Sequence, residues 1–129
     1  MIIESPITPI NQPIQAVIDF VSVPENYKQL MPENISKFEL TGNQSFKFAL
    51  QGMPEFELKL IDIQPQKILL SSANEKTPFQ LSLLLNSTAE NKTNAQFVFE
   101  GNFNAMMSMM IKNPISNFLG VLSQKLGSL

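Results

Sequence analysis

The middle of the chain alternates apolar and polar residues with a period of two, which is typical of strands that have one buried face. The alternation extends from Ile35 to Phe103 and is interrupted at regular intervals by turn residues. The interruptions are Gly42-Asn43, Gly52-Met53-Pro54, Pro65-Gln66, the segment Asn74 to Pro78, and the segment Asn86 to Asn94. They predict six strands in a sheet with one apolar face and one solvated face.

The N-terminal region predicts an edge strand followed by two short helices. Residues Ile2 to Ile10 are rich in β-branched side chains, but Pro6 and Pro9 cannot donate to a strand ladder. Pro13 suits the first turn of a helix, and the apolar residues after it recur at spacings of three and four. These residues are Ile14, Val17, Ile18 and Val21. The first helix is therefore expected to be amphipathic.

The second short helix is expected to begin after Ser22. Ser22 and Glu25 match the pattern of a capping box, with Pro24 between them. Pro32 marks the point before which this helix ends.

A long helix is predicted at the C-terminal end, from Asn104 as its N-cap to about Leu126. Pro114 lies inside it and removes a backbone donor, so we expect a kink there or a restart capped by Asn113. We therefore expect one α+β domain over residues 1–129. In it, a seven-stranded antiparallel sheet curls around the C-terminal helix, with the two short helices between strands one and two.

This order resembles the helix-grip fold of the START-related, polyketide-cyclase-like (SRPBCC) superfamily. Residues 13–20 are similar to the first helix of that family, residues 26–32 resemble the end of its second helix, and residues 103–119 resemble its closing helix. The resemblance covers essentially the whole chain. It implies a cavity between the concave sheet face and the last helix, rimmed by the two short helices and the Gly52-Met53-Pro54 hairpin. Members of the family bind lipids, sterols or polyketides; a minority are cyclases or dehydratases, and some contact a chaperone.

Composition excludes several classes of partner and location. The formal charge is −2, the nine basic residues are scattered lysines, and there is no arginine, so we expect no nucleic-acid partner. There is no cysteine, hence no disulfide or thiolate metal site, and we expect a cytoplasmic protein. The N-terminus lacks the pattern of a signal peptide, and no apolar run approaches ~18 residues, so no membrane span is predicted.

The inventory for catalysis is small, because histidine, cysteine and arginine are all absent. We therefore predict no catalytic residues, no metal site and no cofactor. Asp19 is flanked by apolar residues and offers either an acid of raised pKa or an ordinary solvated helix position. Tyr27 offers either a hydrogen bond at a cavity mouth or simple packing. Glu55 and Glu57 are expected to face solvent.

The leading hypothesis is non-enzymatic binding or carriage of a small hydrophobic ligand, lipid-like or polyketide-like, in an internal cavity. The residues expected to contact it are Phe20, Tyr27, Met31, Phe48, Met53, Phe79, Leu83, Phe97, Phe99, Met107, Met110 and Ile111. The phenylalanines among them are core if they meet the last helix directly and cavity walls if the sheet stands away from it. The short chain favours a small or partly collapsed cavity.

Two other functions stay open. One is a polyketide cyclase or dehydratase in which Asp19 or Tyr27 handles a proton. The other is a protein-interaction module that uses the methionine-rich start of the last helix or an outward Leu84. The four methionines Met106, Met107, Met109 and Met110 point around most of the helix and cannot all face one cavity. Either Met107 and Met110 line a pocket while another methionine meets a loop or partner, or they are core residues with one exposed methionine.

Overall fold

The computed structural model describes residues 1–51, 53–73 and 78–129, and within them the chain forms one antiparallel sheet and three helical segments. The strands are β1 (Ile2–Glu4), β2 (Thr8–Ile10), β3 (Ile35–Gly42), β4 (Ser45–Leu50), β5 (Glu55–Gln64), β6 (Lys67–Ser72), β7 (Phe79–Ala89) and β8 (Lys92–Gly101). The helices are α1 (Ile14–Val21), the 3-10 helix η1 (Pro24–Leu30) and α2 (Ala105–Leu126). The turn residue Gly52 and residues 74–77, both parts of predicted turns, lie outside the described residues.

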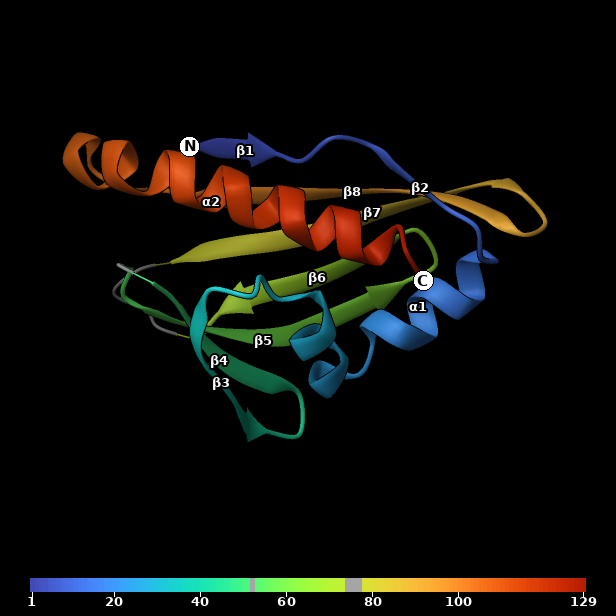
Figure 1. The fold of residues 1–129 in the computed structure, drawn as a ribbon, viewed down its shortest axis with the longest axis horizontal. Coiled ribbons are helices and arrows are strands. Elements are labelled where there is room, and N and C mark those ends of the chain that lie inside the picture. The colour runs from blue at the N-terminus through green and yellow to red at the C-terminus, as the bar shows by residue number, and fades with distance from the viewer. Residues whose placement is uncertain (52, 74–77) are drawn as a thin grey trace.

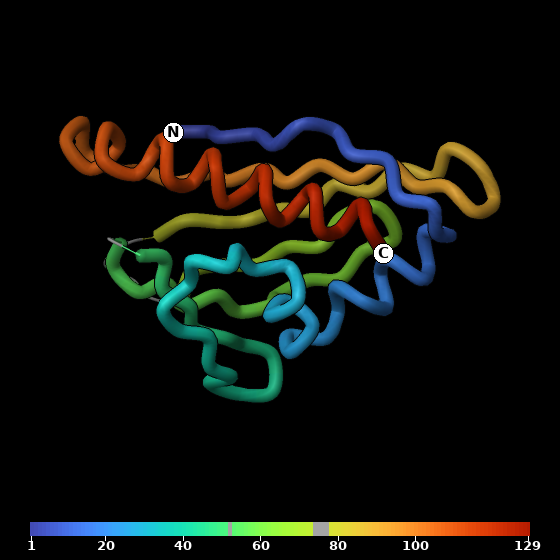
Figure 2. The backbone as a smooth tube through the Cα atoms, viewed as in Figure 1, coloured from blue at the N-terminus to red at the C-terminus, as the bar shows by residue number. Residues whose placement is uncertain are grey.

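The sheet has the order β1-β8-β7-β6-β5-β4-β3, and β2 also pairs with β8. It curls so that α2 lies along its concave face, while α1 lies at one end and η1 lies between α2 and strands β3 and β4 (Figure 1). The tube in Figure 2 shows that the N-terminal strand follows α2 closely before the chain turns into α1. The predicted α+β helix-grip architecture is confirmed, including the two short helices ahead of β3.

The predicted N-terminal strand is two short strands rather than one, which makes the described sheet eight-stranded instead of seven-stranded. Pro6 lacks an amide hydrogen and interrupts the pairing with β8. Ser5 bridges the interruption, because its amide donates to the Phe97 carbonyl at 2.9 Å and its Oγ accepts from the Phe97 amide at 2.9 Å. The N-terminal edge of the sheet thus stays attached to β8 between β1 and β2 through the amide and the hydroxyl of Ser5.

The second helix forms, but without the predicted capping box. It is a 3-10 helix whose N-cap is Val23, and no side chain caps it. Ser22 instead ends α1, and its hydroxyl donates to the Ile18 carbonyl at 2.6 Å. Pro24 occupies the first helical position and has no backbone N–H. The helix start therefore has one unpaired amide fewer for a cap to satisfy.

The interior is filled by the inward faces of β4 to β8 and one face of α2. Residues from α2 that are buried there are Ile111, Ile115, Phe118, Leu119, Leu122, Ser123 and Leu126. Facing them are the alternate residues of the strands, among them Leu58, Ile68, Leu83 and Phe97, each at most 1% exposed. The period-two pattern thus marks the core face correctly.

Helix α2 runs from Ala105 to Leu126 without interruption, with Pro114 inside it, so the predicted restart at Asn113 does not occur. Its predicted N-cap is confirmed, because the Asn104 Oδ1 accepts from the Met107 amide at 2.8 Å. Ile115, the residue after Pro114, and Ile111 are both buried against the sheet, which holds the helix together across the proline.

Asn104→Ala is expected to lower the free energy of unfolding by about 1 kcal/mol, because the Met107 amide loses its acceptor. Urea denaturation followed by circular dichroism measures this change. Asn102→Ala is the matched control, since Asn102 is exposed and its side chain has no hydrogen bond to the described residues. Equal stability of the two variants would show that the cap does not stabilise the helix.

Candidate functional site

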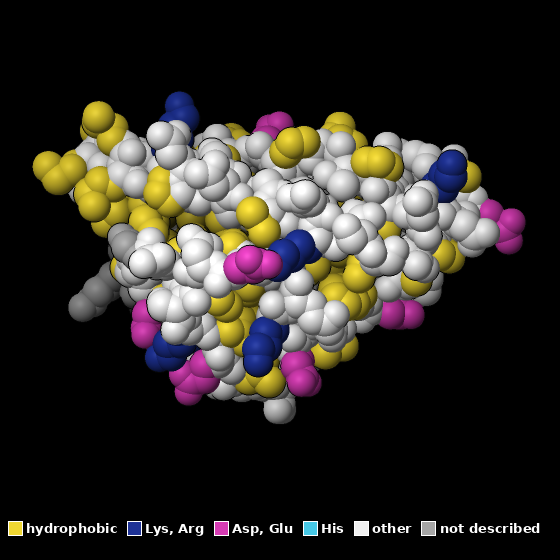
Figure 3. Space-filling model, in the orientation of Figure 1, with side chains coloured by type: hydrophobic (Ala, Val, Ile, Leu, Met, Phe, Trp, Pro, Cys, Tyr) yellow, Lys and Arg dark blue, Asp and Glu magenta, His cyan; other side chains and the backbone are white. Residues whose placement is uncertain are grey.

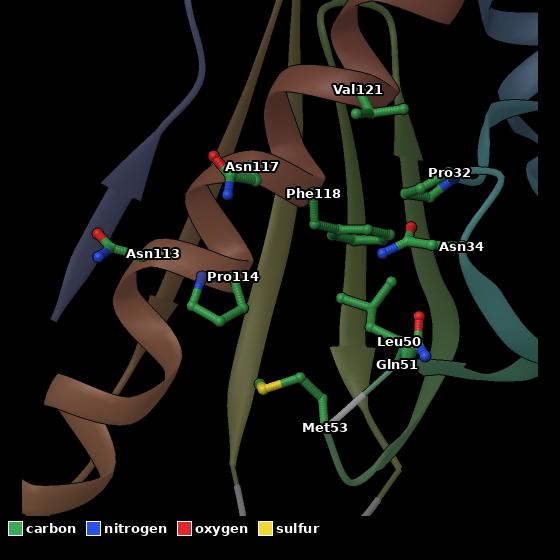
Figure 4. Close-up of a pocket in the computed structure, with 10 residues that line it drawn as sticks. All are labelled: Pro32, Asn34, Leu50, Gln51, Met53, Asn113, Pro114, Asn117, Phe118 and Val121. Atoms are coloured by element: carbon green, nitrogen blue, oxygen red, sulfur yellow. The ribbon is translucent and has the colours of Figure 1, made fainter.

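An open groove of about 420 Å³ lies between α2 and the edge of the sheet at β4. One wall comes from α2, and the other comes from the segment that follows η1 and from the end of β4 (Figure 4). The residues that line it are Pro32, Asn34, Leu50, Gln51, Met53, Asn113, Pro114, Asn117, Phe118 and Val121.

The wall opposite α2 is positioned at both of its ends by hydrogen bonds to backbone carbonyls. At one end, the Lys125 Nζ donates to the Met31 carbonyl at 2.6 Å and ties the chain after η1 to the last turn of α2. At the other, the Met53 amide donates to the Leu50 carbonyl at 3.0 Å and forms the turn after β4. These contacts fix the two segments between which the groove opens.

The floor of the groove is the outer surface of the hydrophobic core. The Phe118 ring stacks on the Phe48 ring of β4, with centroids 5.0 Å apart and an interplanar angle of 11°. Leu50, at the end of β4, is 6% exposed. A molecule in the groove would therefore rest on an aromatic and aliphatic surface that is already well packed from below.

The polar groups of the groove are neutral. The ten lining residues that the structure describes include four carboxamides, Asn34, Gln51, Asn113 and Asn117, and no ionisable side chain. Among the described residues, none of these four side chains is hydrogen-bonded to another group of the protein. In Figure 4 the Asn34 carboxamide extends from its wall toward the Phe118 ring. The groove thus combines an apolar floor with unpaired neutral donors and acceptors.

Most of the residues expected to contact a ligand lie in the packed core. Those that are buried are Tyr27, Met31, Phe48, Phe79, Leu83, Phe97, Phe99 and Ile111. Phe20, Met53 and Met107 are partly buried and pack against that core, whereas Met110 is 62% exposed. Of the twelve, Met53 is the one that lines the groove. Ligand contact by the others stays a prediction.

The predicted phenylalanines behave as core residues where the rings can be compared. Phe48 meets α2 directly through Phe118, and Phe79 stacks on Phe99 with centroids 5.0 Å apart. Phe99 in turn stacks on Phe103, just ahead of α2, at 6.1 Å. Direct contact between sheet and helix is thus observed at Phe48, whereas Phe79 and Phe99 are buried against other rings outside α2.

Tyr27 packs beneath η1 rather than at a mouth of the groove. Its hydroxyl donates to the Val21 carbonyl at 2.9 Å, and its ring stacks on Phe46 with centroids 5.0 Å apart. The side chain is 1% exposed, and this burial raises the pKa of the hydroxyl above its ordinary value of 10.0. Its hydrogen-bonding proton is already used within the protein.

The carboxylates singled out from the sequence also lie away from the groove. Asp19 is on the exposed face of α1, where it accepts from the Gln15 Nε2 at 2.8 Å, so the solvated interpretation holds. Glu55 pairs with Lys37 at 3.0 Å, and the hydrogen bond and charge of Lys37 lower the pKa of its carboxyl. Within the described residues, no cluster of three or more histidine, cysteine, aspartate or glutamate side chains has metal-binding geometry.

Three of the four methionines at the start of α2 are exposed, which neither interpretation anticipated. Met106 is 74%, Met109 81% and Met110 62% exposed, because the first turns of the helix extend beyond the ends of the strands (Figure 1). Figure 3 shows the hydrophobic side chains gathered at that end of the molecule. Met107 alone of the four packs against the core. The outward position of Leu84 is confirmed, at 39% exposed.

Nine of the ten groove residues were missed from the sequence. Asn113, Asn117 and Val121 recur every four residues, so they share one face of α2, next to Phe118. That spacing, with two carboxamides beside an apolar stripe, could have indicated from the sequence that this face of α2 lines a site. Asn34 and Gln51 lie in or beside turns and carry no such periodic signal.

No protein-family model matches the sequence, and the curated proteins give no match either. Solved structures do match over nearly the whole chain. A START superfamily protein from Mycobacterium smegmatis has a TM-score of 0.71 at 11% identity, covering 98% of this chain and 94% of its own. Norcoclaurine synthase from Thalictrum flavum, in complex with dopamine and hydroxybenzaldehyde, has a TM-score of 0.77 at 11% identity, covering 99% and 84%.

A conserved protein from Geobacillus kaustophilus has a TM-score of 0.68 at 14% identity, covering 99% of this chain and 93% of its own. At these identities the comparisons establish the fold. The chain has a START-like (SRPBCC-type) helix-grip fold, which confirms the resemblance inferred from the sequence. No helix in the described residues is long and apolar enough to cross a membrane.

Tyr27 is the only tyrosine, so the ultraviolet absorbance of tyrosinate reports on it alone. Because its folded pKa is raised, its contribution to stability is present below about pH 10 and is lost as the pH rises above that value. In an alkaline titration, tyrosinate is expected to appear only at a higher pH than in the urea-unfolded chain. Ionisation at the same pH in both states would contradict the buried hydrogen bond.

Tyr27→Phe removes the hydroxyl that donates to the Val21 carbonyl and is expected to lower the free energy of unfolding by about 1 kcal/mol without changing the groove.

Proposed function

We propose that the protein binds or carries a small hydrophobic ligand, lipid-like or polyketide-like, without chemical transformation, in the groove between α2 and the end of β4. The observation that carries the proposal is the groove itself, about 420 Å³ in volume and floored by Phe118 and Leu50. Pockets for small molecules are typically about 300–1,000 Å³ and mostly apolar, with a few polar groups that orient the ligand. The groove falls within that range.

The apolar lining gives the binding energy its scale. Burial of about 200 Å² of apolar ligand surface contributes about 5 kcal/mol at ~25 cal/mol per Å², before the cost of association. Phe118, Met53 and Val121 come from opposite walls and can contact two sides of such a ligand. Methionine at position 53 adds adaptability, because its unbranched side chain fits ligands of different shape.

The position of the titratable groups favours binding over catalysis. None of the described residues that line the groove can donate or accept a proton by ionising. The two candidates for proton handling are engaged elsewhere, Asp19 on the exposed face of α1 and Tyr27 with the Val21 carbonyl. A cyclase or dehydratase needs such a group beside the reacting atoms.

The solved structures add support from the fold. The similar norcoclaurine synthase structure contains dopamine and hydroxybenzaldehyde, so a helix-grip protein of this shape accommodates small organic molecules. That protein is an enzyme, as its name states, whereas the groove described here presents carboxamides. The shared fold therefore supports a ligand site, and the lining residues favour a binding role.

Mass spectrometry of the purified protein, run native and then after organic extraction, tests whether a ligand is carried. We expect an apolar compound near one equivalent per chain. An empty protein that also fails to bind Nile red, an uncharged hydrophobic dye, would contradict the proposal. Nile red fluorescence rises on transfer to an apolar site, so its titration gives an affinity directly.

Met53→Glu is expected to weaken Nile red binding by about tenfold or more, because it introduces a charge into the apolar lining of the groove. Met106→Glu is the matched control: Met106 is 74% exposed and lies outside the groove. Met106→Glu should unfold at nearly the wild-type temperature and Met53→Glu at a lower one, because Met53 packs partly against the core, so dye binding is measured well below both unfolding temperatures. Equal dye affinity in the two variants would place the dye elsewhere on the protein.

A further inference from the structure

The chemistry of the groove walls also restricts the charge of what can bind there. Resting on the proposed binding function, we infer that the groove selects uncharged ligands that carry a hydrogen-bonding group, such as an alcohol, ketone or amide, and discriminates against carboxylates of the same length. The inference rests on which side chains line the groove and on what those side chains already contact.

Among the described residues, the groove offers no cation to an anionic ligand. None of the ten lining residues that the structure describes is a lysine, and the chain has no arginine. Two lysines on neighbouring segments are engaged: Lys125 donates to the Met31 carbonyl at 2.6 Å, and Lys37 lies 3.0 Å from Glu55 and 3.4 Å from Glu39. Lys112, next to Asn113 on α2, lies beside β1 rather than in the groove. A carboxylate placed over Phe118 would therefore lose part of its hydration without gaining an ion pair, which is unfavourable.

The groove does offer hydrogen bonds to a neutral group. Each carboxamide carries one acceptor oxygen and two N–H donors, so it can pair with a hydroxyl, a carbonyl or another amide. The four carboxamides are divided between the walls, Asn34 and Gln51 on one and Asn113 and Asn117 on α2. None has a partner among the described residues, so a ligand need not displace an existing protein hydrogen bond.

The arrangement sets an orientation for the ligand. Phe118 and Leu50 form the apolar floor, and Asn34 extends toward the Phe118 ring from the opposite wall (Figure 4). An amphiphile can thus lay its hydrocarbon part on the floor and direct its polar end to the carboxamides at the groove edge. Asn34 is the carboxamide best placed to contact that polar end.

Three molecules with the same ten-carbon chain, 1-decanol, decanamide and decanoic acid, test the selectivity at neutral pH. Each is titrated below its aggregation concentration, and its affinity is measured by calorimetry and by displacement of Nile red. We expect 1-decanol and decanamide to bind, and decanoate to bind at least about tenfold more weakly, because its charge has no partner in the groove.

Substitutions at Asn34 assign the selectivity to the groove. Asn34→Lys places an ammonium beside the floor and is expected to strengthen decanoate binding by about tenfold, while Asn34→Leu is expected to weaken decanamide binding by about fivefold through loss of a hydrogen bond. Asn43→Lys and Asn43→Leu are the matched controls, since Asn43 is an exposed turn residue outside the groove. We expect no change from either control.

The outcomes separate the inference from the function on which it rests. If decanoate binds as tightly as 1-decanol, or if the Asn34 variants behave like the Asn43 controls, the selectivity is overturned while the groove remains a binding site. If none of the three molecules binds to the wild-type protein, the proposed function is overturned, and the inference with it.

Discussion

The contact between Phe118 of α2 and Phe48 of β4 sets how closely the long helix approaches the curled sheet. With ring centroids 5.0 Å apart and nearly parallel planes, the two side chains leave no layer between helix and strand. The residues beside Phe118 on α2, Ile115 and Leu119, are then carried into the same interior and are at most 2% exposed. Packing at this density means that the interior itself is occupied by side chains.

The groove follows from the same contact. Phe118 closes the core on its inner side and forms the groove floor on its outer side, so one ring separates the two. The chain at Pro32 stands off from α2 and is held there by the hydrogen bond from Lys125 to the Met31 carbonyl. A ligand site on this fold therefore needs no hollow interior. Such a site requires only that α2 contacts the sheet at Phe118 while the segment at Pro32 stays apart from the helix.

The features that could be predicted from the sequence are those that depend on neighbouring residues or on a periodic pattern. The period-two pattern marked the strands, and Asn104 was identified as the cap of α2 because its contact with Met107 spans three residues. The sequence did not reveal the serine that bridges the break at Pro6, since the partner of Ser5 is Phe97, far away in sequence. The groove was not predicted for the same reason, because its lining residues are far apart in the sequence. Whether Asn34 faces Phe118 depends on tertiary packing, and polar turn residues carry no pattern that reveals it.

The most direct test of the account is a methyl NMR titration with 1-decanol of the protein labelled at its seven methionine methyl groups. Met53 lines the groove, Met31 is buried, and Met106, Met109 and Met110 are exposed near the N-terminal end of α2, outside the groove. We predict a saturable shift of the Met53 methyl signal, with the signals of Met106 and Met109 unchanged. Saturable shifts confined to the methionines of α2, with Met53 unaffected, would contradict the assignment of the groove as the binding site.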